Sequence, residues 1–509
     1  MNNPIQSNGW NLSRWALALA LGGAVMGAPS ASGAAMVFPG AAWAESTPQA
    51  QGVSTVRLNA AMQYLAYHCG AQKVSQAVVI RNGYLIWKGT DIDNKHGTWS
   101  ATKSFTSTVL GLLIEDGKCA LDTPAASHVP TLQAQYPEVA LRHFTTMTSG
   151  YMAAGDLLDD VDHGQTATPF TPTNSLFAPG AKYAYWDSAM NQFANVLTRI
   201  AGEPIETLFQ RRIADPIGMN RTYWDWLDFG IVDGYPHAVN GGAGNKSKSM
   251  NISAREMARF GHLFLNRGNW NGTQLISAAW IELATRNQVP TNIPPYGGYN
   301  LSGPGCYGYN WWMNGIKADG TRKFPHAPRG LFMALGANNN KCIVIPEWSM
   351  VIVRLGTDGS VDDAVYDMFL LRVGEAVADP DTDGMADEWE AAAFTTPAQC
   401  APTADDDGDG LTNLEEYRAG THPANLASLV ALRAESGDSA GSISWETVLA
   451  LEPYHNFMTR CYSLETSDRV NSPVWTAVPG YVKAPATGAP MSFTASGAAA
   501  FYRLRVWLE

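Results

Sequence analysis

The stretch WSATKSFTSTVLGLL, residues 99–113, holds the pattern that decides the fold. Apolar side chains recur there at the spacing of one helical face, at Phe105, Val109, Leu112 and Leu113. We therefore predict an amphipathic helix that starts near Ser100, a residue type that favours N-caps. Lys103 follows one turn later, where the positive end of the helix dipole disfavours a protonated amine and favours a neutral one, which is a base. Because residues three apart share a helical face, this amine can take the proton of the Ser100 hydroxyl.

The same residues also have a purely structural interpretation. Ser100 would cap the helix, and Lys103 would extend its ammonium group into water. An S-x-x-K pattern is short enough to occur by chance in a chain of 509 residues. The catalytic interpretation therefore needs support from the rest of the chain.

The N-terminus has the pattern of an export signal. Arg14 precedes an apolar run over residues 15–28, and a region of small residues ends at Ala44. The run is too short to span a bilayer, and no later stretch reaches that length. We expect a signal peptide over residues 1–44, no transmembrane segment, and a secreted or periplasmic protein.

Cysteine content and charge narrow the possible partners. The six cysteines of an exported chain are compatible with disulfides and equally with buried free thiols. The formal net charge of −12 argues against nucleic acid as a partner. Twelve acidic residues lie between Asp379 and Glu416 without an intervening Lys or Arg, so the acidity belongs to one segment.

Two segments, residues 379–390 and 405–416, have the spacing of calcium-binding loops. Each places oxygen ligands at positions 1, 3, 5, 9 and 12, a glycine at position 6 and a backbone carbonyl at position 7. The predicted ligands are Asp379, Asp381, Asp383, Met385, Asp387 and Glu390, then Asp405, Asp407, Asp409, Leu411, Asn413 and Glu416. The pair resembles the EF-hand-like or dockerin-like calcium modules of exported bacterial proteins, which implies structural Ca²⁺ and no organic cofactor. A solvated acidic linker is the alternative.

The two flanking regions have different patterns. Residues 426–509 contain short alternating apolar runs broken by Gly, Pro, Ser and Asn, which predicts a C-terminal β-sandwich. Such a domain could contact a surface, a glycan or secretion machinery, or serve as a spacer. Residues 45–378 mix helical stretches with two strand pairs, one turning at Asn82-Gly83 and one over residues 341–356. We expect an α/β or α+β domain with an antiparallel sheet covered by helices.

Several motifs in this domain carry a family resemblance. They are SATK from Ser100, HFTTMTSGY from His143, PGAKYAYWDSAMNQFANVLTRIAGEP from Pro179, ISAREMARFGHLFLNRGNW from Ile252, YGYNWW from Tyr307 and ALGANNNKCIVIPEWSMVIVRLG from Ala334. Their order resembles the serine β-lactamase and penicillin-binding superfamily, in particular its class C-like branch with family VIII carboxylesterases, D-aminopeptidases and 6-aminohexanoate-dimer hydrolases. The resemblance covers roughly residues 55–375.

The resemblance implies a set of site residues. Ser100 would be the nucleophile, Lys103 its base, and Tyr185 the group that passes a proton to the leaving group. Tyr183, its neighbour on the same alternating face, fits a core position. The oxyanion hole would consist of the backbone N–H groups of Ser100 and Ala337.

Two motifs depart from the family pattern. The usual Y-x-N reads Tyr185-Trp186-Asp187, so that Asn191, about one helical turn further, could take over the positioning role. Asp187 itself could act in catalysis or cap a helix. The usual K-T-G reads Ala334-Leu335-Gly336, and the missing cation predicts poor hydrolysis of penicillins and cephalosporins.

The motifs together favour an exported serine hydrolase that acts on a small ester or amide, most simply a carboxylesterase. A D-aminopeptidase or a 6-aminohexanoate-oligomer-type amidase is an alternative. Because two family motifs are altered, a non-catalytic binding or sensor protein on the same scaffold is a third. Three tryptophans, Trp186, Trp311 and Trp312, could line an acyl pocket or pack in the core.

Overall fold

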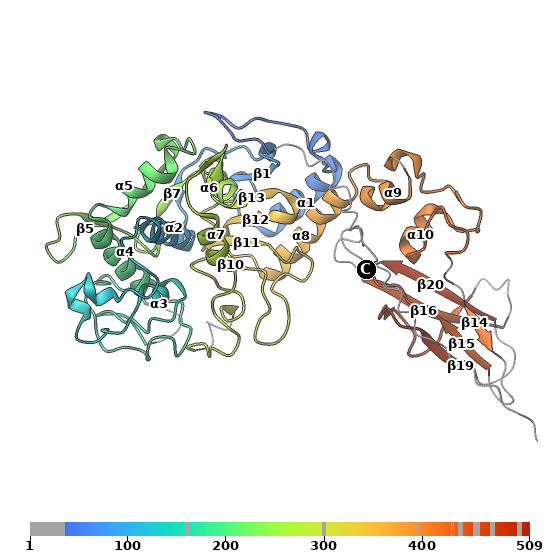
Figure 1. Cartoon of the computed structure of the whole chain (residues 1–509). Coiled ribbons are helices and arrows are strands. Elements are labelled where there is room, and N and C mark those ends of the chain that lie inside the picture. Colours follow the sequence, from blue (N-terminus) through green and yellow to red (C-terminus); the bar gives the residue numbers. More distant parts are fainter. Residues whose placement is uncertain are drawn as a thin grey trace, which may run out of the picture. The chain divides into compact units, whose positions relative to one another are not determined.

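The structure is a computed structural model, and Figure 1 shows it with its elements labelled. It describes residues 36–158, 163–297, 302–394, 396–428, 430, 432–435, 441–450, 459–468, 474–495 and 501–508. The apolar run at 15–28 lies outside the described residues. Among the residues that are described, no helix is long and apolar enough to cross a membrane.

A six-stranded antiparallel sheet forms the centre of the domain, with the strand order β10-β11-β12-β13-β1-β2. The strands are β1 (Ala77–Arg81), β2 (Tyr84–Lys88), β10 (Trp312–Met313), β11 (Phe332–Gly336), β12 (Asn340–Ile345) and β13 (Met350–Arg354). Strands from both ends of the domain are therefore neighbours, as β1 pairs with β13. Both strand pairs predicted from the sequence are confirmed.

Local turn chemistry explains the β1–β2 hairpin. Asn82 and Gly83 both have positive φ, 52° and 85°, as a two-residue type I′ turn requires. A Cβ at Gly83 would lie 1.8 Å from the carbonyl oxygen of Val37, so only glycine fits beneath the chain that crosses this turn.

Helices cover both faces of the sheet. On one face, α1 (Thr55–His68) packs against α8 (Asp363–Ala378), and both bury apolar residues on the sheet. On the other face, α6 (Ala254–Leu265) contacts β1, β12 and β13. It approaches closely because Gly261 faces the sheet, where a Cβ would lie 2.7 Å from the Cys342 sulfur.

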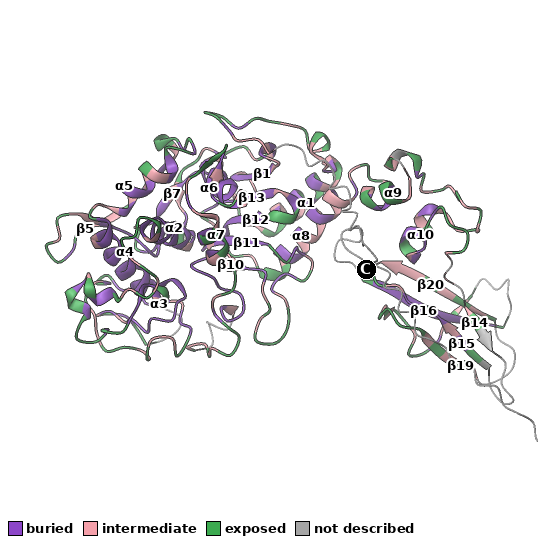
Figure 2. Cartoon of the chain, viewed as in Figure 1, coloured by how far each residue is buried: buried purple, intermediate pink, exposed green. Residues whose placement is uncertain are grey.

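A second, mainly helical region surrounds α2 (Thr102–Glu115). This helix contacts α4 (Asp187–Ala201) and α5 (Ile205–Phe209), and Figure 2 shows α2 and α4 as largely buried. A 3-10 turn, Trp99–Ala101, precedes α2, whose N-cap position is Ala101. The expectation that Ser100 caps the helix was therefore wrong. The other elements are α3 (Leu141–Thr145), α7 (Ala278–Ala284), β3 (His96–Gly97), β4 (Trp224–Trp226), β5 (Asp228–Ile231), β6 (Ala238–Asn240), β7 (Met250–Ile252), β8 (Asn269–Trp270) and β9 (Thr273–Gln274).

The described residues of the C-terminal part form two α-helices and two antiparallel sheets. The helices are α9 (Asp387–Ala393) and α10 (Asn413–Ala419). One sheet holds β14 (Arg433–Glu435), β15 (Gly441–Trp445) and β19 (Met491–Ala495); the other holds β16 (Arg460–Ser467), β17 (Thr476–Ala477), β18 (Ala484–Pro485) and β20 (Phe501–Leu508). Both sheets contribute to one hydrophobic cluster around Trp445 and Tyr462. Cys69, Cys119, Cys306, Cys342 and Cys400 are free thiols, and of these Cys306, Cys342 and Cys400 are buried.

Residues 36–44, which lie within the predicted signal peptide of residues 1–44, pack against the folded domain. Trp43 is 5% exposed and belongs to the main hydrophobic core. The fully buried Arg259 donates hydrogen bonds to the carbonyl oxygens of Gly40 and Ala41, at 2.8 and 3.1 Å. Removal of residues up to Ala44 would expose core surface and leave the Arg259 guanidinium without these acceptors.

We therefore expect a chain that begins at Glu45 to be less stable than one that begins at Met36. Loss of a buried tryptophan alone costs about 3 kcal/mol or more. Thermal and urea unfolding of the two chains, with Trp43→Ala in the longer chain as a matched control, measures the difference. Equal stability of the two chains would show that residues 36–44 contribute nothing.

Candidate active site

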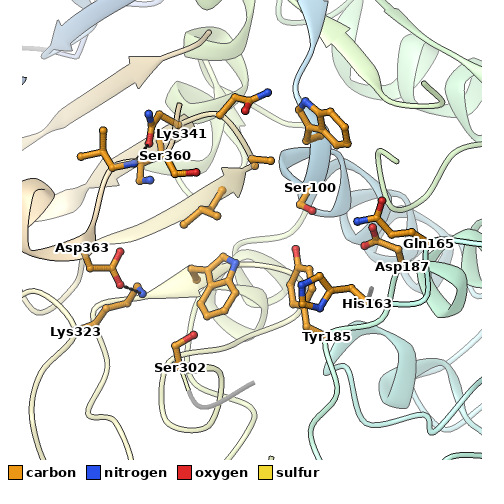
Figure 3. Close-up of a pocket in the computed structure, with 18 of the residues that line it drawn as sticks. Ser100, His163, Gln165, Tyr185, Asp187, Ser302, Lys323, Lys341, Ser360 and Asp363 are labelled. Carbon is orange, nitrogen blue, oxygen red and sulfur yellow. Dashed lines mark hydrogen bonds and ion pairs between the residues drawn. The ribbon is translucent and has the colours of Figure 1, made fainter. Parts of the chain in front are cut away.

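A cavity of about 500 Å³ lies where the sheet meets the helical region. Ser100, Tyr185 and Asp187 lie on one side of it, and Lys323, Lys341 and Asp363 lie on the other (Figure 3). Its volume is within the range of small-molecule sites in proteins.

Two glycines allow the chain around Ser100 to pack tightly. Trp99 has a positive φ of 52°, and a Cβ at Gly244 would lie 2.0 Å from its carbonyl oxygen. A Cβ at Gly336, the last residue of β11, would lie 2.0 Å from the carbonyl oxygen of Thr98. The end of β11 therefore lies directly against the turn that carries Ser100.

Lys103 is buried beside Ser100 and has three oxygen partners. Its Nζ lies 2.8 Å from Ser100 Oγ, 2.7 Å from Asp187 Oδ1 and 2.9 Å from the carbonyl oxygen of Ala243. The side chain is 1% exposed. The alternative in which Lys103 extends into water is therefore wrong, and the structure brings the predicted pair Ser100 and Lys103 into hydrogen-bond contact.

Asp187 is the ion-pair partner of Lys103 and does not cap a helix. It is the first residue of α4, and no side chain caps that helix. Its side chain is 7% exposed, so both charges of the pair are buried. Sequence analysis left the role of Asp187 open, because nothing local predicts a contact across 84 positions.

Asn191 supports the position of Lys103 indirectly, through the segment at residues 243–245. Its Oδ1 accepts a hydrogen bond from the Ala243 N–H at 3.1 Å, and its Nδ2 donates to Asn245 Oδ1 at 2.9 Å. Asn191 therefore fixes the backbone whose carbonyl binds Lys103. Sequence reasoning missed the 243–245 segment altogether.

Tyr185 lines the cavity next to the lysine. The Lys103 Nζ lies 4.6 Å from the centroid of its ring, and the ring stacks against Trp312. Tyr307 packs edge-on against the same ring, but burial raises the pKa of Tyr307 well above its usual value. Tyr307 is therefore poorly suited to proton transfer at neutral pH. Tyr183 is buried, as expected for a core position, and also borders the cavity.

The remaining predicted residues divide between the cavity and the core. Ala337, the proposed source of the second oxyanion N–H, follows β11 and lines the cavity together with Ser100. Trp312 also lines it. Trp311 is fully buried among Phe264 and Phe332, and Trp186 donates a hydrogen bond to Asp156 Oδ2, so these two tryptophans belong to the core.

Comparison with known proteins agrees with this geometry. Residues 70–373 match the protein family described as Beta-lactamase. The chain belongs to the β-lactamase family. Members of this family are serine hydrolases, and the domain is a β-lactamase-fold hydrolase with an antiparallel sheet and helices.

Individual relatives are distant. A β-lactamase of Pseudomonas fluorescens is 24% identical over 125 residues, which cover 24% of this chain and 35% of that protein. The 6-aminohexanoate-dimer hydrolase of Paenarthrobacter ureafaciens is 21% identical over 309 residues, 54% of this chain and 72% of the relative. A solved penicillin-binding protein homologue from Caulobacter crescentus is 16% identical, with a TM-score of 0.46 over 64% of this chain and 99% of that one.

Outside the β-lactamase-family domain, the two acidic loops have matching local geometry. The N–H of Gly384 donates to Asp379 Oδ2 and that of Gly410 to Asp405 Oδ2, each at 3.0 Å. Both glycines have positive φ, 102° and 96°. Carboxylate oxygens converge within 4.8 Å in the sets Asp379, Asp381 and Asp387, Asp381, Asp383 and Glu390, and Asp405, Asp407 and Asp409.

The donor set fits a divalent cation. Both carboxylate oxygens of the fully buried Glu390 and Glu416 lack a hydrogen-bond partner among the described residues, as does Asn413 Oδ1. Burial and the neighbouring carboxylates raise the pKa of Glu390 to about 8 and that of Glu416 to about 7. An oxygen-binding cation would compensate both the unpaired oxygens and the like charges.

The buried ion pair generates a stability prediction. Lys103→Met should lower the free energy of unfolding by about 3 kcal/mol, because it leaves the Asp187 carboxylate buried and unpaired. Lys103→Met combined with Asp187→Asn should recover much of this loss, since no charge then remains. Urea unfolding of the two single variants and the double variant gives the coupling energy. Additive losses would contradict the ion pair.

Proposed function

We propose that this protein is an exported serine hydrolase that cleaves a small ester or amide through an acyl-enzyme on Ser100. The single observation that carries the proposal is the 2.8 Å contact between Ser100 Oγ and Lys103 Nζ at the wall of the cavity. Acyl transfer requires a nucleophile in hydrogen-bond contact with a base, and a third group that holds the base in place.

The three partners of Lys103 suit both of its charge states. As a neutral amine, Lys103 donates its two N–H groups to Asp187 Oδ1 and the Ala243 carbonyl and accepts the Ser100 proton with its lone pair. After proton transfer, the ammonium donates to all three oxygens. Asp187 then stabilises the charge that forms, as an orienting carboxylate does in a catalytic triad.

The remaining steps use Tyr185 and two backbone N–H groups. Ser100 Oγ attacks the carbonyl carbon, and the N–H groups of Ser100 and Ala337 stabilise the oxyanion. The proton held by Lys103 passes through the Tyr185 hydroxyl to the leaving oxygen or nitrogen as its bond to carbon breaks. Water then attacks the acyl-enzyme while its proton passes through the Tyr185 hydroxyl to Lys103. Lys103 returns this proton to Ser100 Oγ as the bond between Ser100 and the acyl carbon breaks and the acid departs.

Ester cleavage is the simplest activity for this machinery, and carboxylesterase is our first assignment. An amidase of the D-aminopeptidase or 6-aminohexanoate-oligomer type is the alternative, supported by the relative named 6-aminohexanoate-dimer hydrolase. The intact contact between Ser100 and Lys103 argues against a binding or sensor protein that has lost catalysis.

Labelling with a fluorophosphonate probe tests the nucleophile directly. The wild-type chain should react at Ser100, and Ser100→Ala should lose the label and reduce p-nitrophenyl butyrate turnover at least about a thousandfold. Ser360→Ala changes another serine of the same cavity and should keep both the labelling and the ester turnover. A folded wild-type chain that neither reacts with the probe nor hydrolyses the ester would favour the binding protein.

We further propose that the loops at 379–390 and 405–416 bind structural Ca²⁺, and that residues 426–509 form a β-sandwich that contacts a surface, a glycan or secretion machinery. The unpaired oxygens of Glu390 and Glu416 support the ion, and the hydrophobic cluster shared by two sheets supports the sandwich. When bound, the ion would neutralise the clustered carboxylates and stiffen the loops. No step of the proposed acyl transfer uses it.

Calcium removal should therefore reduce stability and leave the chemistry intact. A ligand at a hundredfold excess over its Kd raises the free energy of unfolding by about 2.7 kcal/mol, and EGTA would remove this contribution. We expect a lower melting transition with EGTA and an unchanged kcat on p-nitrophenyl butyrate at low temperature. Glu390→Gln combined with Glu416→Gln should abolish the calcium-dependent shift. Immediate loss of kcat in chelated, folded protein would place the ion in catalysis.

A further inference from the structure

The wall of the cavity opposite Ser100 carries an uncompensated positive charge. Lys341 on β12 and Lys323 both line this wall, and both are more than nine-tenths buried (Figure 3). Lys323 forms an ion pair with Asp363 at the start of α8. Within the described residues, no carboxylate lies within ion-pair distance of Lys341, whose Nζ instead lies 4.0 Å from the centroid of the Tyr366 ring. Two cations and one carboxylate therefore share the wall.

A second donor, in the turn that precedes β12, lines the same cavity as Lys341. Asn338 and Asn339 form the β11–β12 turn with φ of 59° and 62°, and both line the cavity. The Oδ1 of Asn339 accepts a hydrogen bond from the Val361 N–H at 2.7 Å, which fixes the orientation of its amide. Its Nδ2 has no hydrogen-bond partner in the described part of the chain, although the residue is 3% exposed. A buried donor without an acceptor is costly unless a ligand supplies one.

Among the described residues, the rest of the cavity does not compensate this charge. On the Ser100 side, Lys103 and Asp187 neutralise each other. Arg354, the other cation near Lys341, is paired with Asp358. Burial lowers the pKa of Lys341 to about 8, and Asp363 opposes that shift, so the ammonium form still predominates at neutral pH.

We propose that Lys341, together with the Asn339 amide, binds a carboxylate of the substrate across the cavity from Ser100. This deepens the proposed function, on which it rests: the preferred substrates are esters or amides that carry a second, anionic group. The cation that the sequence lacks at residues 334–336 is present on the neighbouring strand, because Lys341 pairs directly with Leu335.

Competitive inhibition tests the site without assuming which end of the substrate is anionic. The assay is hydrolysis of the neutral ester p-nitrophenyl butyrate, with glutarate as the anionic inhibitor and glutaramide as its neutral counterpart. We expect glutarate to inhibit the wild-type chain at least about tenfold more strongly than glutaramide, the size of one charge-assisted hydrogen bond.

Three variants separate charge from packing. Lys341→Met should raise the inhibition constant of glutarate about tenfold and leave that of glutaramide within about twofold. Lys341→Arg should stay close to wild type. Asp363→Asn removes the only carboxylate among the described residues of this wall. It should therefore lower the inhibition constant of glutarate, whereas Lys341→Met should raise it. A purely structural effect of these changes would not follow the sign of the charge.

Failure of the carboxylate site and failure of the hydrolase assignment give different results in these experiments. Equal inhibition by glutarate and glutaramide, or an unchanged glutarate constant in Lys341→Met with an unaltered thermal melt, would overturn the carboxylate site. If the wild-type chain neither reacts with the fluorophosphonate probe nor hydrolyses the neutral ester, the hydrolase assignment fails instead. Calorimetric titration of glutarate into wild type and Lys341→Met then still decides whether the carboxylate site exists.

Discussion

The buried contact of Lys103 with Asp187, Ala243 and Ser100 is the constraint on which the active-site region depends. A lysine removed from water needs nearby oxygens, and here they come from three separate segments. The contact joins the start of α2 to the start of α4 and to the 243–245 segment. Asn191 forms hydrogen bonds with both ends of that segment. The same ion pair therefore fixes the helical region and supplies the proposed proton acceptor.

The sequence predicted those features that arise from neighbouring residues. Asn82-Gly83 determines its hairpin through backbone conformation alone, and Ser100 and Lys103 are close because they are three residues apart. The role of Asp187 could not be predicted, because its partner lies 84 positions away and an aspartate at a helix start equally suggests a cap. Lys341 was missed for the same reason, since its place in the cavity depends on the pairing of β11 with β12.

The predicted N-terminal boundary rests on a local pattern alone. A small-residue region ending at Ala44 fits export processing, but nothing in that pattern indicates that Trp43 fills a core position. The acidic loops are the opposite case, because the spacing of their ligands is itself local. The structure adds what the spacing cannot show, namely that Glu390 and Glu416 are fully buried and that their carboxylate oxygens have no hydrogen-bond partner among the described residues.

The two walls of the cavity divide its electrostatic tasks. On the Ser100 wall the charges of Lys103 and Asp187 compensate each other, so this wall adds no net charge to the cavity. The opposite wall keeps one positive charge, displaced from β11 to β12 by one strand, or about 4.8 Å. A cation displaced in this way still attracts an anion, but the bound anion then lies at a different distance from the Ser100 hydroxyl. A ligand with a rigid spacing between its carbonyl and its carboxylate is then a poorer match than a flexible chain, which can adjust its length to reach both walls.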